Sequence, residues 1–383
     1  MLIAKFVSIS VVTLFATLTA ADAAKEKVLH EFTGQSDDGG SPAGDLIGDA
    51  QGNVYGTTVF GGAFGEGTIF KVSPRGRETI LHSFNGIPDG SVPEAGLVMD
   101  GAGNLYGTAS GGTGGSGVVF ELTRKNQFTV LYAFRTNPDG QFPHGSLVLD
   151  ASGNLYGTTE EGGTKCPCGT VFKVTPTGEE TILYSFGGGT DGRIPKAGLI
   201  LSPDGQLYGT TAAGGGNCDC GTVFKISMDG TETLLHSFSG GRDGSEPSGQ
   251  LIADSTGKLY GVTAAGGHCG CGPVFSISPE GKEEIVYAFG KGAGYDGAQP
   301  VGRLVLDADG NLYGATHAGG PMDYGTVFKV RAAPGKERVL HLFAGGDDGA
   351  NPYAGMVDIG GALIGTTGNG GSYGEGVVFK IKK

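Results

Sequence analysis

The stretch Asn154-Leu155-Tyr156-Gly157-Thr158-Thr159 decides the fold, because close copies of it recur along the chain of 383 residues. Its tyrosine returns at a nearly constant interval, at Tyr55, Tyr106, Tyr156, Tyr208, Tyr260 and Tyr313, with Ile364 in a seventh copy. The successive spacings are 51, 50, 52, 52, 53 and 51 residues. A period of about 50 residues with turn signals inside each unit indicates an array of supersecondary units.

Each unit contains four short runs with the composition of β-strands, here named a to d. In the third unit they are residues 146–150, 154–159, 170–174 and 181–186, separated by turns rich in Gly, Pro and Asp. Runs of β-branched and aromatic residues between such turns are typical of strands and hairpins. Seven such units predict an all-β fold, a seven-bladed β-propeller with four antiparallel strands per blade.

The two ends of the repeat array predict how the ring closes. The first run, residues 27–32, is typical of strand d, whereas the last run, residues 376–381, is typical of strand c. The last blade therefore lacks its outer strand, and the N-terminal strand is available to pair with it. This pairing removes an exposed sheet edge, so residues 24–383 are expected to form a single propeller domain.

The first 23 residues have the pattern of a secretory signal peptide. Lys5 precedes an apolar run that extends from Phe6 to Leu18, and small residues at Ala21 and Ala23 precede a cleavage site. We therefore expect a secreted or periplasmic protein with no membrane span after signal removal. The formal net charge of −13 and the pI near 4.9 argue against a nucleic-acid partner, because an acidic surface repels phosphates.

The units resemble the GloVer tandem repeats of exported bacterial proteins, through the segments GNLYGTT, GG, CGTVFK and Asp-Gly-x-x-Pro. The resemblance extends over nearly all of residues 27–383. It implies an exported protein built of propeller-like repeats, and it brings no established activity with it. The hairpin Asp-x-x-Gly-Asn-Leu-Tyr is also similar, more weakly, to those of NHL and gluconolactonase-type propellers.

Two polar features recur in every unit and are interpreted as structural. The Asp-Gly-x-x-Pro motif lies in each d–a loop, at Asp38, Asp89, Asp139, Asp191, Asp243, Asp296 and Asp348. Seven carboxylates could bind Ca²⁺, but equal copies favour turns in which Asp accepts local backbone N–H groups. Two residues before the strand-d Phe stands His or Tyr, at His30, His82, Tyr132, Tyr184, His236, Tyr287 and His341. Because Tyr replaces His there, no metal site and no cofactor are expected.

The six cysteines form three Cys-x-Cys pairs in the b–c loops of consecutive units: Cys166/Cys168, Cys218/Cys220 and Cys269/Cys271. An exported chain permits disulfides, and a bulged turn can bring residues two apart into the required Cα range. Binding of a soft metal is the alternative, which His268 beside Cys269 favours. One pair supplies only two ligands, so we predict three disulfides within the loops.

Residues that differ between units mark a candidate ligand site. The d–a and b–c loops are expected on one face, where the positions just after Asp-Gly-x-x-Pro vary in charge and shape. The candidate ligand-binding residues are Asp45, Glu94, His144, Lys196, Gln250, Arg303 and Tyr353. A mixed polar and aromatic ring around a channel mouth suits a polar ligand such as a sugar or a peptide. An ordinary solvated rim is the alternative.

Three functions remain open from the sequence. The favoured one is an exported binding or interaction module for an extracellular glycan or protein ligand. An extracellular hydrolase or lyase with its site at the channel mouth is the second. The sequence has no G-x-S-x-G elbow that leads from a strand into a helix, no H-E-x-x-H and no phosphate-loop motif, so the catalytic residues are unknown. A structural surface or matrix protein is the third.

Overall fold

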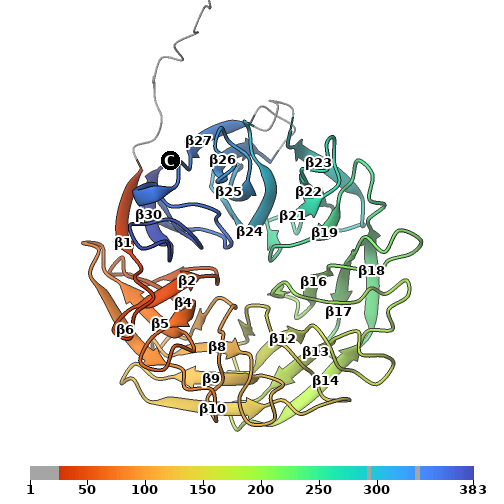
Figure 1. The fold of residues 1–383 in the computed structure, drawn as a ribbon. Coiled ribbons are helices and arrows are strands. Elements are labelled where there is room, and N and C mark those ends of the chain that lie inside the picture. The colour runs from red at the N-terminus through yellow and green to blue at the C-terminus, as the bar shows by residue number, and fades with distance from the viewer. Residues whose placement is uncertain (1–25, 291–294, 333–336) are drawn as a thin grey trace, which may run out of the picture.

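Seven antiparallel sheets stand around a central axis as the blades of a propeller (Figure 1). The computed structural model describes residues 26–290, 295–332 and 337–383, so the predicted signal peptide at residues 1–23 lies outside the described residues. Five sheets have four strands and two have five. The prediction of an all-β, seven-bladed propeller is confirmed.

The blades are numbered 1 to 7 in chain order, and each supplies one strand to each of four concentric layers. The innermost strands, a, are β3 (Ile47–Gly48), β7 (Val98–Met99), β11 (Val148–Leu149), β15 (Ile200–Leu201), β20 (Ile252–Ala253), β24 (Ala298–Leu306) and β28 (Val357–Ile359). Strands b are β4 (Val54–Gly61), β8 (Leu105–Ala109), β12 (Leu155–Thr159), β16 (Leu207–Thr211), β21 (Leu259–Ala265), β25 (Asn311–Ala318) and β29 (Ala362–Thr367).

The outer two layers complete the blades. Strands c are β5 (Thr68–Val72), β9 (Val118–Leu122), β13 (Thr170–Val174), β17 (Thr222–Ile226), β22 (Pro273–Ile277), β26 (Thr326–Arg331) and β30 (Val377–Lys382). Strands d are β6 (Glu78–Ser83), β10 (Phe128–Ala133), β14 (Glu180–Ser185), β18 (Glu232–Ser237), β23 (Glu283–Ala288), β27 (Arg338–Leu342) and β1 (Lys27–Glu31). The d–a loops add β2 (Gly39–Pro42), β19 (Ser245–Pro247) and the 3₁₀ turn η1 (Gly346–Asp348).

The ring closes as predicted, through the two ends of the array. Strand β1 pairs antiparallel with β30, with Val28 opposite Phe379 and Glu31 opposite Val377. The outer strand of blade 7 is therefore supplied by the start of the chain, and the edge of β30 is covered.

The innermost strand of blade 3 is shorter than the sequence predicts. Residues 146–150 were expected as a strand, but only Val148–Leu149 pair with β12. Leu147 is buried just before the strand begins, and it packs against the sheet at Gly157. The residues before it therefore belong to the d–a loop and line the central channel.

Within a blade, the core depends on a glycine in strand b. A Cβ atom at Gly157 would lie 2.6 Å from Cζ of Phe172 in strand c and 2.7 Å from Cδ2 of Leu147. The glycines at this position are all approached by a strand-c Phe to 2.4–2.7 Å in the same way, at Gly56, Gly107, Gly157, Gly209, Gly261, Gly314 and Gly365. Gly is required because the aromatic edge occupies the place of a side chain.

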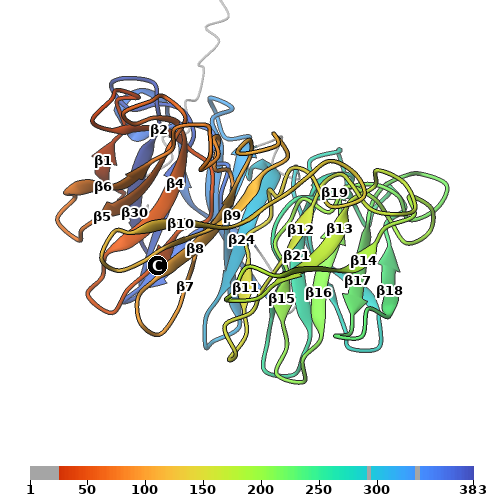
Figure 2. The same cartoon turned by 90° about the horizontal axis from the view of Figure 1, so that it is seen from below.

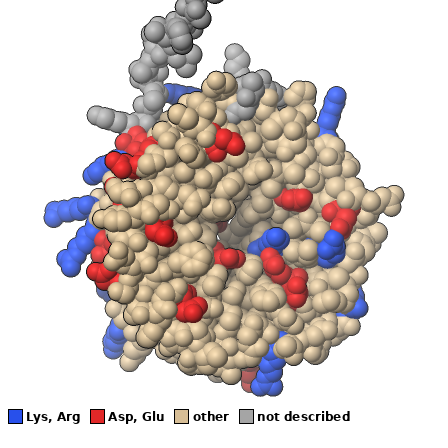
Figure 3. All heavy atoms as spheres, viewed as in Figure 1, with Lys and Arg blue, Asp and Glu red and all other residues tan. Residues whose placement is uncertain are grey.

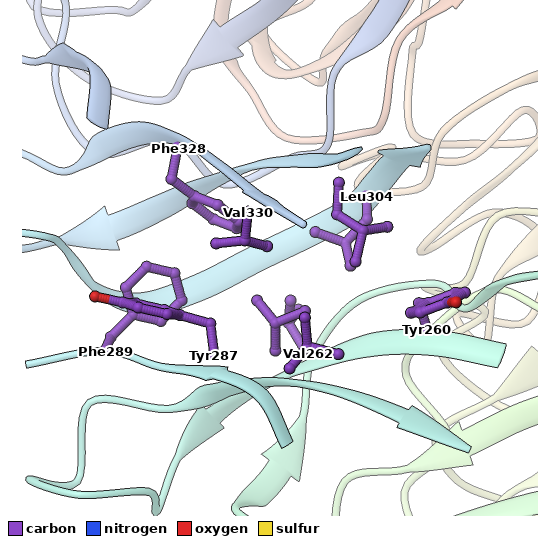
Figure 4. Packing of buried hydrophobic residues seen from close by; sticks show 10 residues of the cluster. Tyr260, Val262, Tyr287, Phe289, Leu304, Phe328 and Val330 are labelled. Carbon is purple, nitrogen blue, oxygen red and sulfur yellow. The ribbon is translucent and has the colours of Figure 1, made fainter. Parts of the chain in front are cut away.

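Between blades, the core depends on pairs of phenylalanines. The strand-d Phe of each blade meets the strand-c Phe of the next edge to face, and the ring centroids of all seven pairs are 4.9–5.5 Å apart. Figure 4 shows this contact between blades 5 and 6, where Phe289 and Phe328 pack with Val262, Leu304 and Val330. Edge-to-face pairs add about 0.5–1.5 kcal/mol each beyond their buried area, so these contacts help to hold the blades together.

We predict that Gly157→Ala destabilises the protein by about 1–3 kcal/mol, because the added methyl group overpacks a filled space. Thermal unfolding followed by circular dichroism measures the change. Gly189→Ala is the matched control, since Gly189 has no heavy atom within 4 Å of an added Cβ. Equal melting temperatures for the two variants would contradict this account of the glycine.

Candidate functional site

The d–a and b–c loops emerge on one face of the ring, named here the mouth face. Viewed from the side, β2 and β19 of the d–a loops lie at one end of the molecule, and the turns that follow β11 and β15 lie at the other (Figure 2). The mouth face has a hollow at its centre, with charged side chains of both signs gathered on one side of it (Figure 3). A cavity of about 510 Å³ occupies the mouth.

The structure brings most of the predicted site residues together in this cavity. Six of the seven line it, namely Asp45, Glu94, His144, Lys196, Gln250 and Tyr353. Arg303 does not; it lies deeper, in a cavity of about 310 Å³ that it shares with Asp45 and Gln250. The predicted residues therefore form two layers of one channel.

Backbone hydrogen bonds hold the loops that carry the mouth residues in place. The residue before the proline of every Asp-Gly-x-x-Pro motif has a positive φ of 50–59°, at Ser41, Val92, Phe142, Ile194, Glu246, Gln299 and Asn351. Residues other than glycine rarely adopt this backbone conformation. It is maintained because each N–H donates to a carbonyl in the b–c loop of the preceding blade, as from Phe142 to Ser116 at 2.9 Å and from Ile194 to Cys168 at 3.0 Å. The next residue but one is thereby aimed at the channel mouth.

The predicted cysteine pairs form disulfides in b–c loops that accept these hydrogen bonds. Cys166–Cys168, Cys218–Cys220 and Cys269–Cys271 are bonded, with Cα atoms 5.2–5.3 Å apart. The carbonyl oxygen of the second cysteine of each pair accepts the N–H of the positive-φ residue, at Ile194, Glu246 and Gln299. The disulfides therefore stiffen the loops that position the rim of blades 4 to 6.

A group of four charged residues, the charged cluster, occupies one side of the mouth. His144 Nδ1 lies 3.2 Å from Glu160 Oε1 and 3.4 Å from Glu94 Oε2. Lys196 Nζ lies 3.9 Å from the same oxygen of Glu160. These residues come from three consecutive blade junctions, and nothing equivalent is repeated around the described part of the ring.

The charged cluster shifts the protonation of its own members. Burial lowers the pKa of His144, but the hydrogen bond to Glu160 and the charge of Glu94 outweigh it, so the pKa is raised. Burial raises the pKa of Glu160, but the hydrogen bond from His144 and the charges of His144 and Lys196 leave it lowered. The cluster therefore favours charged forms and keeps ionic groups at a partly buried surface.

The deeper layer is partly engaged in holding blades together. The Asp45 carboxylate accepts the N–H of Gly355 in blade 7, and Gln250 donates to the carbonyl of Leu199 in blade 4. Ser146 Oγ accepts the N–H of Gly96 at 3.0 Å. Among the described residues Asp45 and Arg303 form no ion pair, so Asp45 serves the scaffold as well as the channel.

Sequence reasoning missed Glu160, which lines the cavity, and Ser110, which contacts His144. Both occupy the place directly after the second Thr or its equivalent in strand b, where the seven blades carry Val59, Ser110, Glu160, Ala212, Ala264, His317 and Gly368. This variation resembles that of the d–a loops and is the signal that could have identified them. At the same position His317 packs against Tyr353, with ring centroids 4.5 Å apart.

The repeat itself identifies a family. The Gloeobacter/Verrucomicrobia repeat matches residues 12–219, 108–305 and 167–379. The chain belongs to this repeat family. No curated protein matches the chain.

Several solved structures have a fold similar to that of this repeat chain. The extracellular domain of BT4673 from B. thetaiotaomicron, a proposed one component system, has 14% identity and a TM-score of 0.59 and covers 94% of this chain. The chain spans 42% of that structure, less than half of its length.

Two further similar structures are named as enzymes. Oligogalacturonate lyase VPA0088 from Vibrio parahaemolyticus has 10% identity and a TM-score of 0.59, and the match covers 94% of this chain and 93% of that one. A proposed gluconolactonase has 14% identity and a TM-score of 0.46, over 83% and 94% of the two chains. The match to the lyase shows a common propeller fold alone. In the part of the chain that the structure describes, no helix has the length and apolar character needed to cross a membrane.

The seven Asp-Gly-x-x-Pro carboxylates of the Gloeobacter/Verrucomicrobia repeats lie at separate blade junctions. Asp139 Oδ2 accepts the Tyr132 hydroxyl at 2.9 Å and the Arg135 N–H at 2.8 Å. At other junctions His replaces Tyr, as in the 2.8 Å contact of His82 with Asp89. In every blade a β-bulge between strands c and d lies directly before this His or Tyr. Bulges are common where a side chain is re-aimed. These contacts support the structural interpretation of both motifs.

Six of these junctions also contain a glutamate whose Oε1 atom is buried without a hydrogen-bond partner. These residues are Glu26, Glu78, Glu180, Glu232, Glu283 and Glu337. At the seventh junction Phe128 takes its place and stacks on His82, with centroids 3.9 Å apart. Burial, and then the charge of Asp139, raise the pKa of Glu180 to about 7. At one junction, ligand atoms of Glu26, His341 and Asp348 lie within 4.8 Å of one another, which is a local form of the same repeated arrangement.

We predict that the junction glutamates make the protein more stable at mildly acidic pH. A carboxyl whose pKa is raised on folding stabilises the fold while it is protonated, and this contribution is lost as pH rises from about 4.5 through about 7. Glu180→Gln removes the ionisation, so its melting temperature should equal that of the wild type at pH 5 and exceed it by roughly 2 °C at pH 8. Glu179→Gln, on the exposed neighbour, is the control. A difference that does not change with pH would contradict the prediction.

Proposed function

We propose that the chain is an exported binding module, secreted or periplasmic, that holds a polar ligand, a glycan or a peptide, at the channel mouth. One observation carries the proposal. The scaffold is sevenfold, whereas the charged cluster of Glu94, His144, Glu160 and Lys196 is confined to neighbouring blades. A group that served packing would recur in every blade, so a local departure from the repeat supports a separate role.

The chemistry of the mouth supports a polar ligand. Glu94 and Lys196 have side chains 41% and 54% exposed, so both retain hydrogen-bonding capacity toward the cavity. Tyr353 stands across the same cavity and is about half exposed, and it offers an aromatic surface with a hydroxyl group. Sites for sugars and peptides combine such a flat ring with a few oriented polar groups.

The similar extracellular domain of BT4673 is compatible with a binding role for this fold outside the cytoplasm, at the level of fold alone. A flat rim would have favoured a purely structural surface or matrix protein. The hollow of about 510 Å³ supports the binding role instead.

The test is a screen of a glycan and peptide array with the protein lacking its first 23 residues, followed by titration of the best ligand. We predict that the pair Glu94→Ala and Lys196→Ala weakens binding at least tenfold, about 1.4 kcal/mol. The fold should be kept, since exposed substitutions usually change stability by about 0.5 kcal/mol or less.

The matched control is the pair Arg77→Ala and Arg124→Ala, which also removes two exposed charges but from the opposite face. Binding that survives the first pair and is lost in the second would place the ligand on the wrong face for this proposal.

A further inference from the structure

A serine hydroxyl, an imidazole and a carboxylate follow one another at the edge of the mouth. Ser110 Oγ lies 3.3 Å from Nε2 of His144. On the other side of the same ring, Nδ1 lies 3.2 Å from Oε1 of Glu160. The three residues come from blade 2, the loop between blades 2 and 3, and blade 3, so the fold alone brings them together.

The carboxylates decide which nitrogen of His144 carries the proton in the neutral ring. Glu160 and Glu94 both face Nδ1, so a proton on Nδ1 is hydrogen bonded and the lone pair is left on Nε2. The lone pair then points at the Ser110 hydroxyl. This is the tautomer that a base needs in order to take a proton from serine.

The scaffold does not require the Ser110 hydroxyl. The equivalent residues of blades 4 and 5 are Ala212 and Ala264. Thr108, two residues earlier, differs in this respect, because its hydroxyl is used to donate to the carbonyl of Pro143 at 2.6 Å. The backbone carbonyl of Ser110 accepts the N–H of Ser91 at 2.7 Å, which fixes the residue while its partly buried side chain faces His144.

We propose that Ser110 is a nucleophile, His144 its general base and Glu160 the positioning residue of a hydrolase that cleaves a carboxylic ester on the ligand of this mouth. The inference rests on the proposed function, because His144 and Glu160 line the same cavity. Lys196 Nζ lies 3.9 Å from Oε1 of Glu160, and its positive charge helps to keep that carboxylate ionised.

The reaction balances without any cofactor. Ser110 Oγ attacks the ester carbonyl carbon and its proton passes to Nε2 of His144. The ester C–O bond then breaks, and the departing alcohol takes that proton, which leaves an acyl-serine. Water attacks the acyl-serine, gives a proton to His144 and releases the carboxylic acid, after which the proton returns to Ser110. The distance of 3.3 Å is within the looser range seen before substrate binds.

The test uses the full chain after residue 23, a fluorophosphonate probe and p-nitrophenyl acetate. We expect the probe to modify the peptide that contains Ser110, and Ser110→Ala and His144→Ser to lower labelling and ester hydrolysis at least 100-fold. Both variants carry residues that other blades have at the same position, Ala212 and Ser248, so the fold should tolerate them. Ser152→Ala, in an exposed turn between strands a and b, is the control that should label like the wild type.

Glu160→Gln separates positioning from a structural role. Because Glu160 raises the pKa of His144, the variant should reach half-maximal labelling at a lower pH than the wild type, as well as react more slowly. A slower reaction with an unchanged pH profile would overturn the role of Glu160.

The outcomes distinguish this inference from the proposed function. Equal labelling of wild type and Ser110→Ala, or labelling of another serine, overturns the hydrolase while leaving ligand binding intact. Ligand binding that is kept in Ser110→Ala, together with lost labelling, supports both. The binding proposal would be overturned instead by an unchanged ligand affinity in the double variant of Glu94 and Lys196.

Discussion

The approach of a phenylalanine edge to a bare backbone is the constraint on which the rest of the structure depends. In blade 3 the ring of Phe172 fills the space where a side chain of Gly157 would stand, and the same ring meets Phe134 of the preceding blade edge to face. The same aromatic ring therefore packs within one sheet and between two. Because this happens in every blade, the glycine and the phenylalanine cannot vary independently, and the repeat in the sequence is the trace of that packing.

Function can vary only where this packing is absent. The d–a loops are held by the proline motif and by N–H groups donated to the preceding blade. The residue before the proline therefore has the same backbone conformation in each blade, while the side chains at the mouth are free to differ. His144 and Lys196 stand on equivalent backbone positions and carry different chemistry. A regular ring thus presents an irregular set of groups, which is how a symmetric fold supports an asymmetric site.

Much of the fold could be predicted from the sequence, because packing imposes patterns that repeat seven times. The blade number, the pairing of β1 with β30 and the cysteine pairs all follow from such counts. The site could be predicted less completely, because a residue that occurs in one blade only leaves no repeated pattern in the sequence. Glu160 and Ser110 were missed because they lie on strand-b ends, outside the loops that were compared. Arg303 was expected at the mouth, yet it lies one layer deeper, in the cavity that it shares with Asp45 and Gln250 at the equivalent positions of blades 1 and 5.

The pairing of β1 with β30 also sets an order of events for the protein in the cell. A chain that is synthesised from its N-terminus delivers β1 first and β30 last. The outer strand of blade 7, β1, must therefore wait unpaired until almost the whole chain has been made. The ring is complete only at that moment, so the first strand of the propeller to be made is the last to find its partner.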